Sequence, residues 1–279
     1  TLLHPYIESK GSFGKAYSRD MVPAAYRYTE AGLAKFSAEI FADISKDTVD
    51  FVDNYDATMK EPTLLPVTFP SVLVNANTGI AVGMASSICS FNLSEVCETT
   101  VNFIRDPDTD IIDTLPAPDF PGGGTVMYDA DEMKKIYETG RGGFKVRGKY
   151  TYDKAYNCID ITQIPPTTNC ESIIEKVIEL VKLKKITEIN DIRDETGRDG
   201  MKITIDLKRG IDPDKLMQKL FKLTPLEDTF SCNFNILIAG SPRVMGIREI
   251  LEEWVAFRIE CVRRRTHFDL VKKQEKLHL

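Results

Sequence analysis

Two adjacent side chains, Arg27 and Tyr28, offer the clearest candidate for chemistry in this sequence. A phenol is a poor nucleophile at neutral pH, because almost all of it is protonated. A nearby cation favours the phenolate, and the planar guanidinium of arginine fits the oxygens of a phosphate. The pair could therefore attack a phosphodiester, with Arg27 stabilising the charge that develops on it. From these two residues alone, an ordinary buried or capping tyrosine remains the alternative.

The preceding residues 9–19 could approach a phosphate closely. Gly11 and Gly14 leave room for a backbone to come near. The segment also carries three cations: Lys10, Lys15 and Arg19. We expect a basic loop here that contacts nucleic acid, and a solvated surface loop is the alternative.

Ile80 is a candidate of another kind. It lies in the small-residue run 71–86, which predicts a strand, a turn at Asn77-Thr78-Gly79 and a second strand that carries Ile80. An apolar side chain at a strand tip can wedge between base pairs and kink DNA. A core isoleucine is the alternative.

The composition indicates a packed fold and excludes several classes of protein. With 279 residues, 42% hydrophobic and 28% charged, the chain should form about two domains. It contains no apolar run long enough to span a membrane, no P-loop motif and no Ser-His-Asp arrangement. Six scattered cysteines without a CxxC pair, and only three histidines, predict reduced, mostly buried thiols and no zinc site.

The charge of the chain is uneven. The net charge of −6 and the pI of about 5.3 argue against a nucleic-acid binder when taken globally. Residues 1–35, however, hold five Lys or Arg against three acids, whereas residues 36–61 hold two against seven. A local basic patch beside Tyr28 is therefore predicted, and the local field decides a phosphate contact.

The periodicity of the chain predicts an α+β fold. Apolar residues at helical spacing predict helices over 30–46, 93–105, 130–139, 173–186, 212–223 and 246–279. Alternation predicts strands over 144–152, 156–164, 201–208 and 229–239, the first two paired with each other. Asn92 with Glu95 and Thr168 with Glu171 are capping-box pairs, and Gly140 is a helix C-cap. We expect an antiparallel sheet with helices on one side, followed by a long exposed helix that forms half of a coiled coil.

Several ordered motifs resemble one protein family. The motifs near Tyr28 are Lys10-Gly-Ser-Phe-Gly14 and Ala25-Tyr-Arg-Tyr-Thr-Glu30, followed by 48–56, 73–85, 118–121, 139–142, 161–165, 193–195 and 199–201. Together they resemble the breakage-reunion region of the bacterial type IIA DNA topoisomerase A subunits, those of DNA gyrase and topoisomerase IV. The resemblance spans nearly the whole chain. It does not separate gyrase from topoisomerase IV.

The resemblance implies roles for the candidate residues. Tyr28 would be the nucleophile that holds a 5′ phosphate of DNA, Arg27 its transition-state partner and Ile80 the wedge that bends the DNA. It also implies a domain division: the end of a winged-helix domain at 1–61, a tower domain at 62–243 and the start of a coiled-coil arm at 244–279.

The resemblance further implies partners for this chain. The enzyme would be an ATP-dependent type II topoisomerase of the cytoplasm, associated with the nucleoid and with no membrane. Two A subunits and two B subunits would act on double-stranded DNA as an A2B2 complex. The B subunit would hold Mg²⁺ and ATP, while no metal would be held by this chain. The chain would begin after the family's DNA-recognition helix, so the isolated segment is expected to be inactive. A non-catalytic DNA-binding and assembly scaffold is the alternative.

Overall fold

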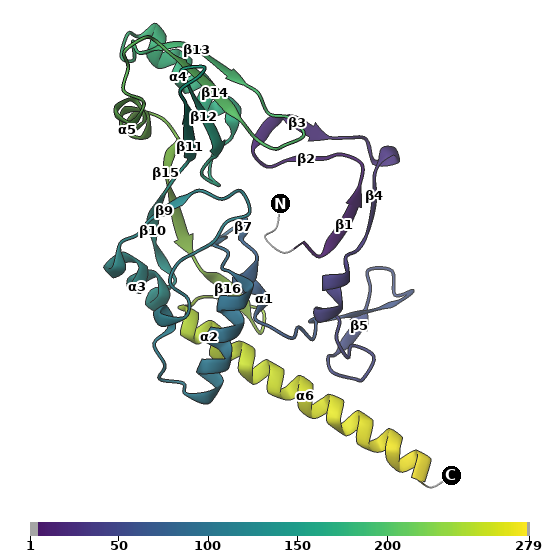
Figure 1. Ribbon diagram of the computed structural model, residues 1–279. Helices are drawn as coiled ribbons and strands as arrows, with labels where there is room; N and C mark the ends of the chain where they lie inside the picture. Colours follow the sequence, from purple (N-terminus) through teal and green to yellow (C-terminus); the bar gives the residue numbers. More distant parts are fainter. Residues whose placement is uncertain (1–4, 278–279) are drawn as a thin grey trace.

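The computed structural model describes residues 5–277 of the chain. Three parts follow one another along the sequence (Figure 1): an extended N-terminal arm, a body of two main antiparallel sheets with helices, and the long helix α6, which leaves the body at one end. The predicted α+β class is confirmed. The predicted domain boundaries stay predictions, and residues of all three ranges, such as Ile40, Phe69 and Ile250, contribute to one hydrophobic core.

The arm consists of short strands and a turn. It contains two antiparallel pairs: β1 (Ile7–Lys10) with β4 (Glu30–Leu33), and β2 (Phe13–Lys15) with β3 (Ser18–Pro23). The short 3-10 helix η1 (Tyr26–Tyr28) connects β3 to β4. The basic segment 9–19 is therefore mostly strand, where we expected a loop.

The predicted helix over 30–46 is wrong. Its first residues form β4, and a short 3-10 helix η2 (Lys35–Glu39) follows. The backbone of β4 bonds to β1, which lies much earlier in the chain, and this distant pairing takes the place of helical bonds. The apolar spacing still has a use, because Ile40 is buried and Phe36 packs against the core of the body.

The lower sheet of the body has five strands in the order β7-β8-β15-β10-β9. Its strands are β7 (Asn77–Ala81), β8 (Met84–Ile88), β9 (Thr125–Met127), β10 (Arg141–Arg147) and β15 (Glu227–Asn233). Around it lie α1 (Ser71–Val74), α2 (Leu93–Arg105), η3 (Ile111–Asp113) and α3 (Ala130–Thr139). Fully buried side chains such as Phe91, Ile136 and Phe234 fill the core between these elements.

The upper sheet has four strands in the order β11-β12-β14-β13. They are β11 (Lys149–Asp153), β12 (Cys158–Gln163), β13 (Ile189–Asp194) and β14 (Ile203–Leu207), with helices α4 (Cys170–Lys182) and α5 (Pro213–Leu223) packed on them. Ile159, Ile173 and Ile205 belong to its own buried cluster. The body therefore has two main sheets, each with its own core, where we expected one sheet.

Two predicted strands are each divided between two sheets. The segment 144–152 leaves the lower sheet at Gly148, whose N–H donates to the carbonyl of Leu226, so only its second half pairs with 156–164. The segment 229–239 is divided at Phe234 into β15 and β16 (Asn235–Ile238), which pairs with β17 (Ser241–Val244).

The helix ends follow the local sequence with one exception. The Asn92 side chain caps α2, and Gly140 ends α3 with a φ of 71°. At α4 the predicted cap Thr168 is wrong: Asn169 accepts the hydrogen bond from the N–H of Ser172. The carboxylate of Glu171, predicted to complete a capping box, instead bonds to the arm.

Ion pairs fasten helix α6 (Ile247–Leu277) to the acidic segment before β5 (Phe51–Asp53) and β6 (Lys60–Pro62). Arg264 pairs with Asp47 and Asp50 at 2.9 and 2.8 Å, and Arg265 pairs with Asp43 at 3.0 Å. Asp43 and Asp47 have φ values of 60° and 55°, so tight turns aim these acids at the helix. The predicted coiled-coil partner of α6 stays a prediction.

The thiols agree with the sequence interpretation. All six cysteines are free, and all except Cys97 are buried, as predicted. Among the helices of residues 5–277, none combines the length and the apolar character that a membrane crossing needs.

The pair of Arg265 and Asp43 gives the first testable prediction. We expect Arg265→Ala to lower the free energy of unfolding by about 1 kcal/mol, because it leaves a half-buried carboxylate without its main partner. The hydrogen bond from Arg265 lowers the pKa of Asp43, so the contribution is present above about pH 4 and is lost as the pH falls through the lowered pKa of the folded state.

Urea unfolding at pH 7 and at pH 3 measures this contribution. Lys273→Ala is the matched control, since Lys273 is exposed on the same helix and has no ion pair within residues 5–277. Equal stability of the Arg265 and Lys273 variants at pH 7 would contradict the prediction.

Candidate functional site

Arg27 and Tyr28 lie together in the exposed turn η1. The N–H of Tyr28 donates to the carbonyl of Ala25 at 2.9 Å, which closes the turn. The guanidinium carbon of Arg27 lies 4.9 Å from the centroid of the Tyr28 ring, within the range of a cation–π contact. Tyr28 is 66% exposed, so its alternative role as a buried tyrosine is excluded. Within residues 5–277, no side chain hydrogen-bonds to the Tyr28 hydroxyl.

Gly11 lies against the backbone of this turn. It has a φ of 90°, and a Cβ atom placed there would lie 2.4 Å from the carbonyl oxygen of Tyr28. No residue with a side chain fits so close to a backbone carbonyl. Gly11 therefore allows the chain to pass close to its own Tyr28 turn, and the close approach to a phosphate stays a prediction.

Lys10 lies at the end of β1, opposite the start of β4, and so flanks the segment that carries Arg27 and Tyr28. Lys10 and Glu30 face each other at the ends of β1 and β4, and their side chains form an ion pair at 3.2 Å. Both side chains are largely exposed, so the pair is weak and Lys10 can exchange Glu30 for another anion. Its role as a phosphate contact stays a prediction.

Arg19 and Lys15 lie at the other end of the arm. Arg19 Nη2 donates to Glu175 of α4 at 2.7 Å, and this hydrogen bond is the main cause of the raised pKa of Arg19. Lys15 has no ion pair within the part of the chain that the structure describes, and it lines a cavity of about 430 Å³ with Tyr17 and Phe120. Of the three cations in the segment, Lys15 is therefore the one with no anionic partner of its own.

Two acids of α4 take part in the site, although the sequence pattern did not indicate them. Glu171 accepts hydrogen bonds from the hydroxyl of Ser18 and from the N–H groups of Arg19 and Asp20, and Glu175 accepts from the Arg19 side chain. The only signal in the sequence was a pair of acids one helical turn apart. That signal also fits an ordinary helix start.

Ile80 lies at the tip of the hairpin formed by β7 and β8. The turn falls at Val82 and Gly83, which has a φ of 81°, so the turn predicted at residues 77–79 is wrong. Ile80 is 91% exposed and Val82 is fully exposed, which excludes the core alternative for Ile80. Ile80 and Val82 are both β-branched and lie two residues apart, so they form a small exposed apolar patch at the hairpin tip.

The structure brings some predicted residues together and leaves one apart. Arg27 and Tyr28 are in contact, and Lys10 is linked to them through the strand pair that encloses their turn. Within residues 5–277, no hydrogen bond or ion pair joins the arm to Ile80. The two candidate DNA contacts are therefore presented from separate elements.

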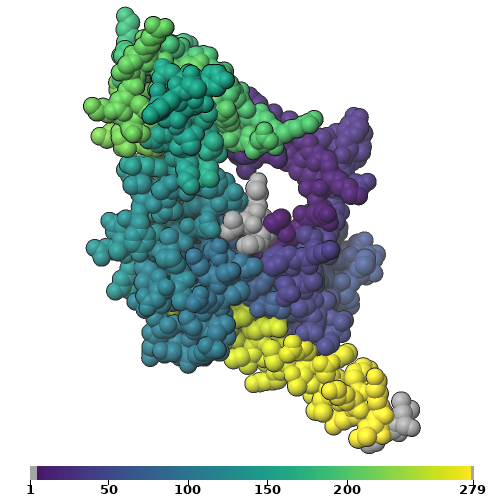
Figure 2. Space-filling model, viewed as in Figure 1, coloured from purple at the N-terminus to yellow at the C-terminus, as the bar shows by residue number. Residues whose placement is uncertain are grey.

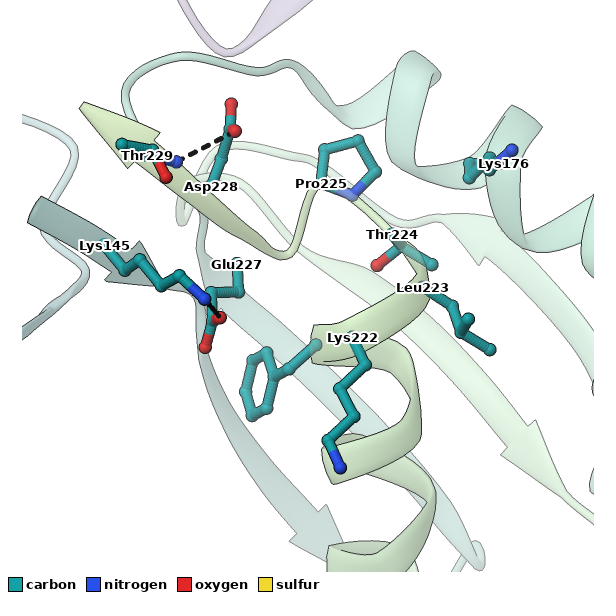
Figure 3. A pocket seen from close by; sticks show the side chains of 10 residues that line it. Lys145, Lys176, Lys222, Leu223, Thr224, Pro225, Glu227, Asp228 and Thr229 are labelled. Atoms are coloured by element: carbon teal, nitrogen blue, oxygen red, sulfur yellow. Dashed lines mark hydrogen bonds and ion pairs between the residues drawn. The ribbon is translucent and has the colours of Figure 1, made fainter. Parts of the chain in front are cut away.

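A larger cavity lies away from these residues. It measures about 550 Å³ and lies between the end of α5 and β15 (Figure 3). Three lysines line it, but Lys145 pairs with Glu227 and Lys176 pairs with Glu179. Its charges are largely neutralised, and none of the predicted site residues lines it. Residues 5–277 also contain no group of three or more His, Cys, Asp or Glu side chains arranged to hold a metal ion.

Comparison with known proteins identifies the family of the chain. The model of one protein family, the A subunits of DNA gyrase and topoisomerase IV, matches residues 1–279. The chain belongs to this family.

Curated relatives show how much of the family protein is present. The chain is 42% identical to the DNA gyrase A subunit of Ureaplasma parvum over 98% of its own length and 33% of the relative. It is 40% identical to the DNA gyrase A subunit of Mycoplasma pneumoniae over 100% of its own length and 34% of the relative. It is 39% identical to the chloroplastic/mitochondrial DNA gyrase A subunit of Arabidopsis thaliana over 99% of its own length and 30% of the relative. The chain thus spans about a third of the length of these relatives.

The contact between Gly11 and Tyr28 gives the second prediction. We expect Gly11→Ala to loosen the Tyr28 turn, because its methyl group would collide with the Tyr28 carbonyl and its φ disfavours a side chain. Amide hydrogen exchange across residues 26–33 should become at least about tenfold faster. The matched control is Gly32→Ala on the paired strand, where no atom lies within 4 Å of the new methyl group. If the two variants exchange alike, the support of the turn by Gly11 is contradicted.

Proposed function

We propose that this chain supplies the DNA-cleaving part of an ATP-dependent type II DNA topoisomerase. The observation that carries the proposal is the contact of the Arg27 guanidinium with the solvent-facing Tyr28 ring, in a chain that belongs to the family of gyrase and topoisomerase IV A subunits. An exposed phenol beside a permanent cation is chemically suited to attack a large, charged substrate such as duplex DNA.

The proposed step is a transesterification. The Tyr28 oxygen attacks the phosphorus of a phosphodiester, a bond forms to the 5′ phosphate, and the 3′ oxygen of the neighbouring nucleotide leaves. The phenol proton passes to solvent water, and the leaving 3′ oxygen takes up a proton to become a hydroxyl. The reverse attack by the 3′ hydroxyl restores the DNA. One phosphodiester replaces another, so cutting and resealing need no ATP.

Arg27 and Ile80 have supporting roles in this proposal. The Arg27 guanidinium lies close enough to the ring to bind a non-bridging oxygen of the attacked phosphate as charge develops on it. Ile80, exposed at its hairpin tip, is placed to enter a base step and bend the duplex. Lys10, Lys15 and Arg19 add positive potential along the arm.

The remaining chemistry belongs to partners. The described residues do not fit a metal site, so none of them is given the role of a metal ligand in the proposed step. We propose that the B subunit binds Mg²⁺ and ATP, and that two A subunits and two B subunits form the working cytoplasmic complex.

The uneven charge of the chain favours a second candidate function. Lys10, Lys15 and Arg19 could hold DNA, while the net charge of −6 suits contacts with protein partners, so the chain alone could be a scaffold that joins the two without cutting. A salt titration of duplex binding by the segment tests it: a scaffold binds at low salt and weakens steeply as salt rises. If no binding is detected at low salt, the scaffold function is contradicted for the segment.

The third prediction concerns the nucleophile. In the full-length A subunit with its B subunit, supercoiled DNA and Mg²⁺, Tyr28→Phe should lower covalent DNA–protein adducts by at least about a thousandfold, because it removes the attacking oxygen. Denaturing gels measure the adducts. Tyr26→Phe is the control: Tyr26 is exposed in the same turn, and its loss should leave cleavage nearly unchanged. Persistent adducts in Tyr28→Phe would refute the assignment.

The fourth prediction concerns the bend. Ile80→Ala should reduce the bend of a bound duplex, measured by energy transfer between dyes at its ends, because the methyl side chain is too short to separate two base pairs. Leu237→Ala is the control, since Leu237 is also an exposed apolar residue on a two-stranded hairpin. An unchanged bend in the Ile80 variant would show that the hairpin tip does not act as a wedge.

A further inference from the structure

The arm is attached to the body at both of its ends. At its base, β4 pairs with β1 and leads into residues 34–41, where Phe36 and Ile40 pack with the lower core. At its upper end, the hairpin of β2 and β3 lies against α4 of the upper sheet (Figure 1). The surface view shows the arm meeting the upper part of the body there (Figure 2). The Tyr28 turn lies between the two attachments in the chain, after β3 and before β4.

The upper attachment is built around one carboxylate. Glu171 takes three donors from the arm: the hydroxyl of Ser18, the N–H of Arg19 at 3.0 Å and the N–H of Asp20 at 3.3 Å. Burial alone would raise the pKa of Glu171, but these hydrogen bonds outweigh it and lower the pKa to about 2. The group is therefore a carboxylate at physiological pH, and its favourable contribution is complete above about pH 4.5 and is lost as the pH falls from there through about 2.

Two further contacts lie beside this carboxylate. The N–H of Cys170 donates to the carbonyl of Tyr17 at 2.9 Å, and Arg19 bonds to Glu175 at 2.7 Å. The pair of Arg19 and Glu175 is exposed and adds little on its own. Glu171 is partly buried and bonds to the backbone, so it constrains the position of β3 itself.

We propose that Glu171 is a positioning residue for strand cleavage. By holding β3 on α4, it fixes the place of the Arg27 and Tyr28 turn relative to the body that carries the Ile80 hairpin. The inference rests on the proposed function of Tyr28. A nucleophile on a loose arm would spend most of its time away from the phosphate, and a displacement of about 1 Å can cost up to about a hundredfold in rate.

The first test measures how firmly β3 is held on α4, by amide exchange and without DNA. In the full-length A subunit, Glu171→Ala should speed amide exchange at Arg19 and Asp20 by at least about tenfold, because both N–H groups lose their acceptor. Ser18→Ala removes a donor from the arm side and should give a smaller change in the same direction. Glu179→Ala is the matched control on α4, because Glu179 bonds to Lys176 rather than to the arm. Exchange as slow as in the control would overturn the proposal.

The second test reads cleavage in the complex with the B subunit, supercoiled DNA and Mg²⁺. Glu171→Ala should slow adduct formation at saturating DNA by about ten- to a hundredfold, while duplex affinity stays within about twofold, since a positioning defect affects the reacting complex and not its formation. Faster exchange with an unchanged cleavage rate would overturn the positioning role. If Tyr28→Phe still forms adducts, the proposed function fails separately, while the exchange result still reports on the attachment.

Discussion

The structure depends on how an arm without a core of its own is held in place. In β1, β2, β4 and the Tyr28 turn no side chain is buried, and in β3 only Ser18 is. Hydrophobic burial therefore contributes little within the arm, apart from Tyr17, which packs against the upper core from the turn between β2 and β3. Backbone pairing within the arm and hydrogen bonds to α4 act beside this contact, and both require short distances.

The residues that stabilise the fold are different from the residues with candidate roles in chemistry. The two sheets of the body bury isoleucine, leucine and phenylalanine side chains and provide rigid supports. The residues with candidate roles in chemistry, Arg27, Tyr28 and Ile80, are all exposed. An exposed phenol and an exposed apolar tip contribute little to folding, so both side chains are free for the contacts with DNA that we propose.

Acidic side chains attach the arm and helix α6 to the rest of the chain. Glu171 holds the arm, and Asp43 with Asp47 holds helix α6 through Arg265 and Arg264. The negative charge that argued against nucleic-acid binding is thus partly engaged in internal contacts. The arm retains Lys15 without an anionic partner among the described residues, and Lys10 in a weak exposed pair.

Local sequence determined the features that depend on neighbouring residues. The Asn92 cap, the Gly140 helix end, the strands predicted over 156–164 and 201–208 and the contact of Arg27 with Tyr28 each involve a few consecutive positions, and these features agree with the structure. Only the tertiary structure decided the rest. The segment after Glu30 pairs as a strand with β1, and Glu171 bonds to Ser18 across 153 positions of the chain. The physical reason is that a short hydrogen bond between distant residues depends on how the whole chain folds, and no local period records it.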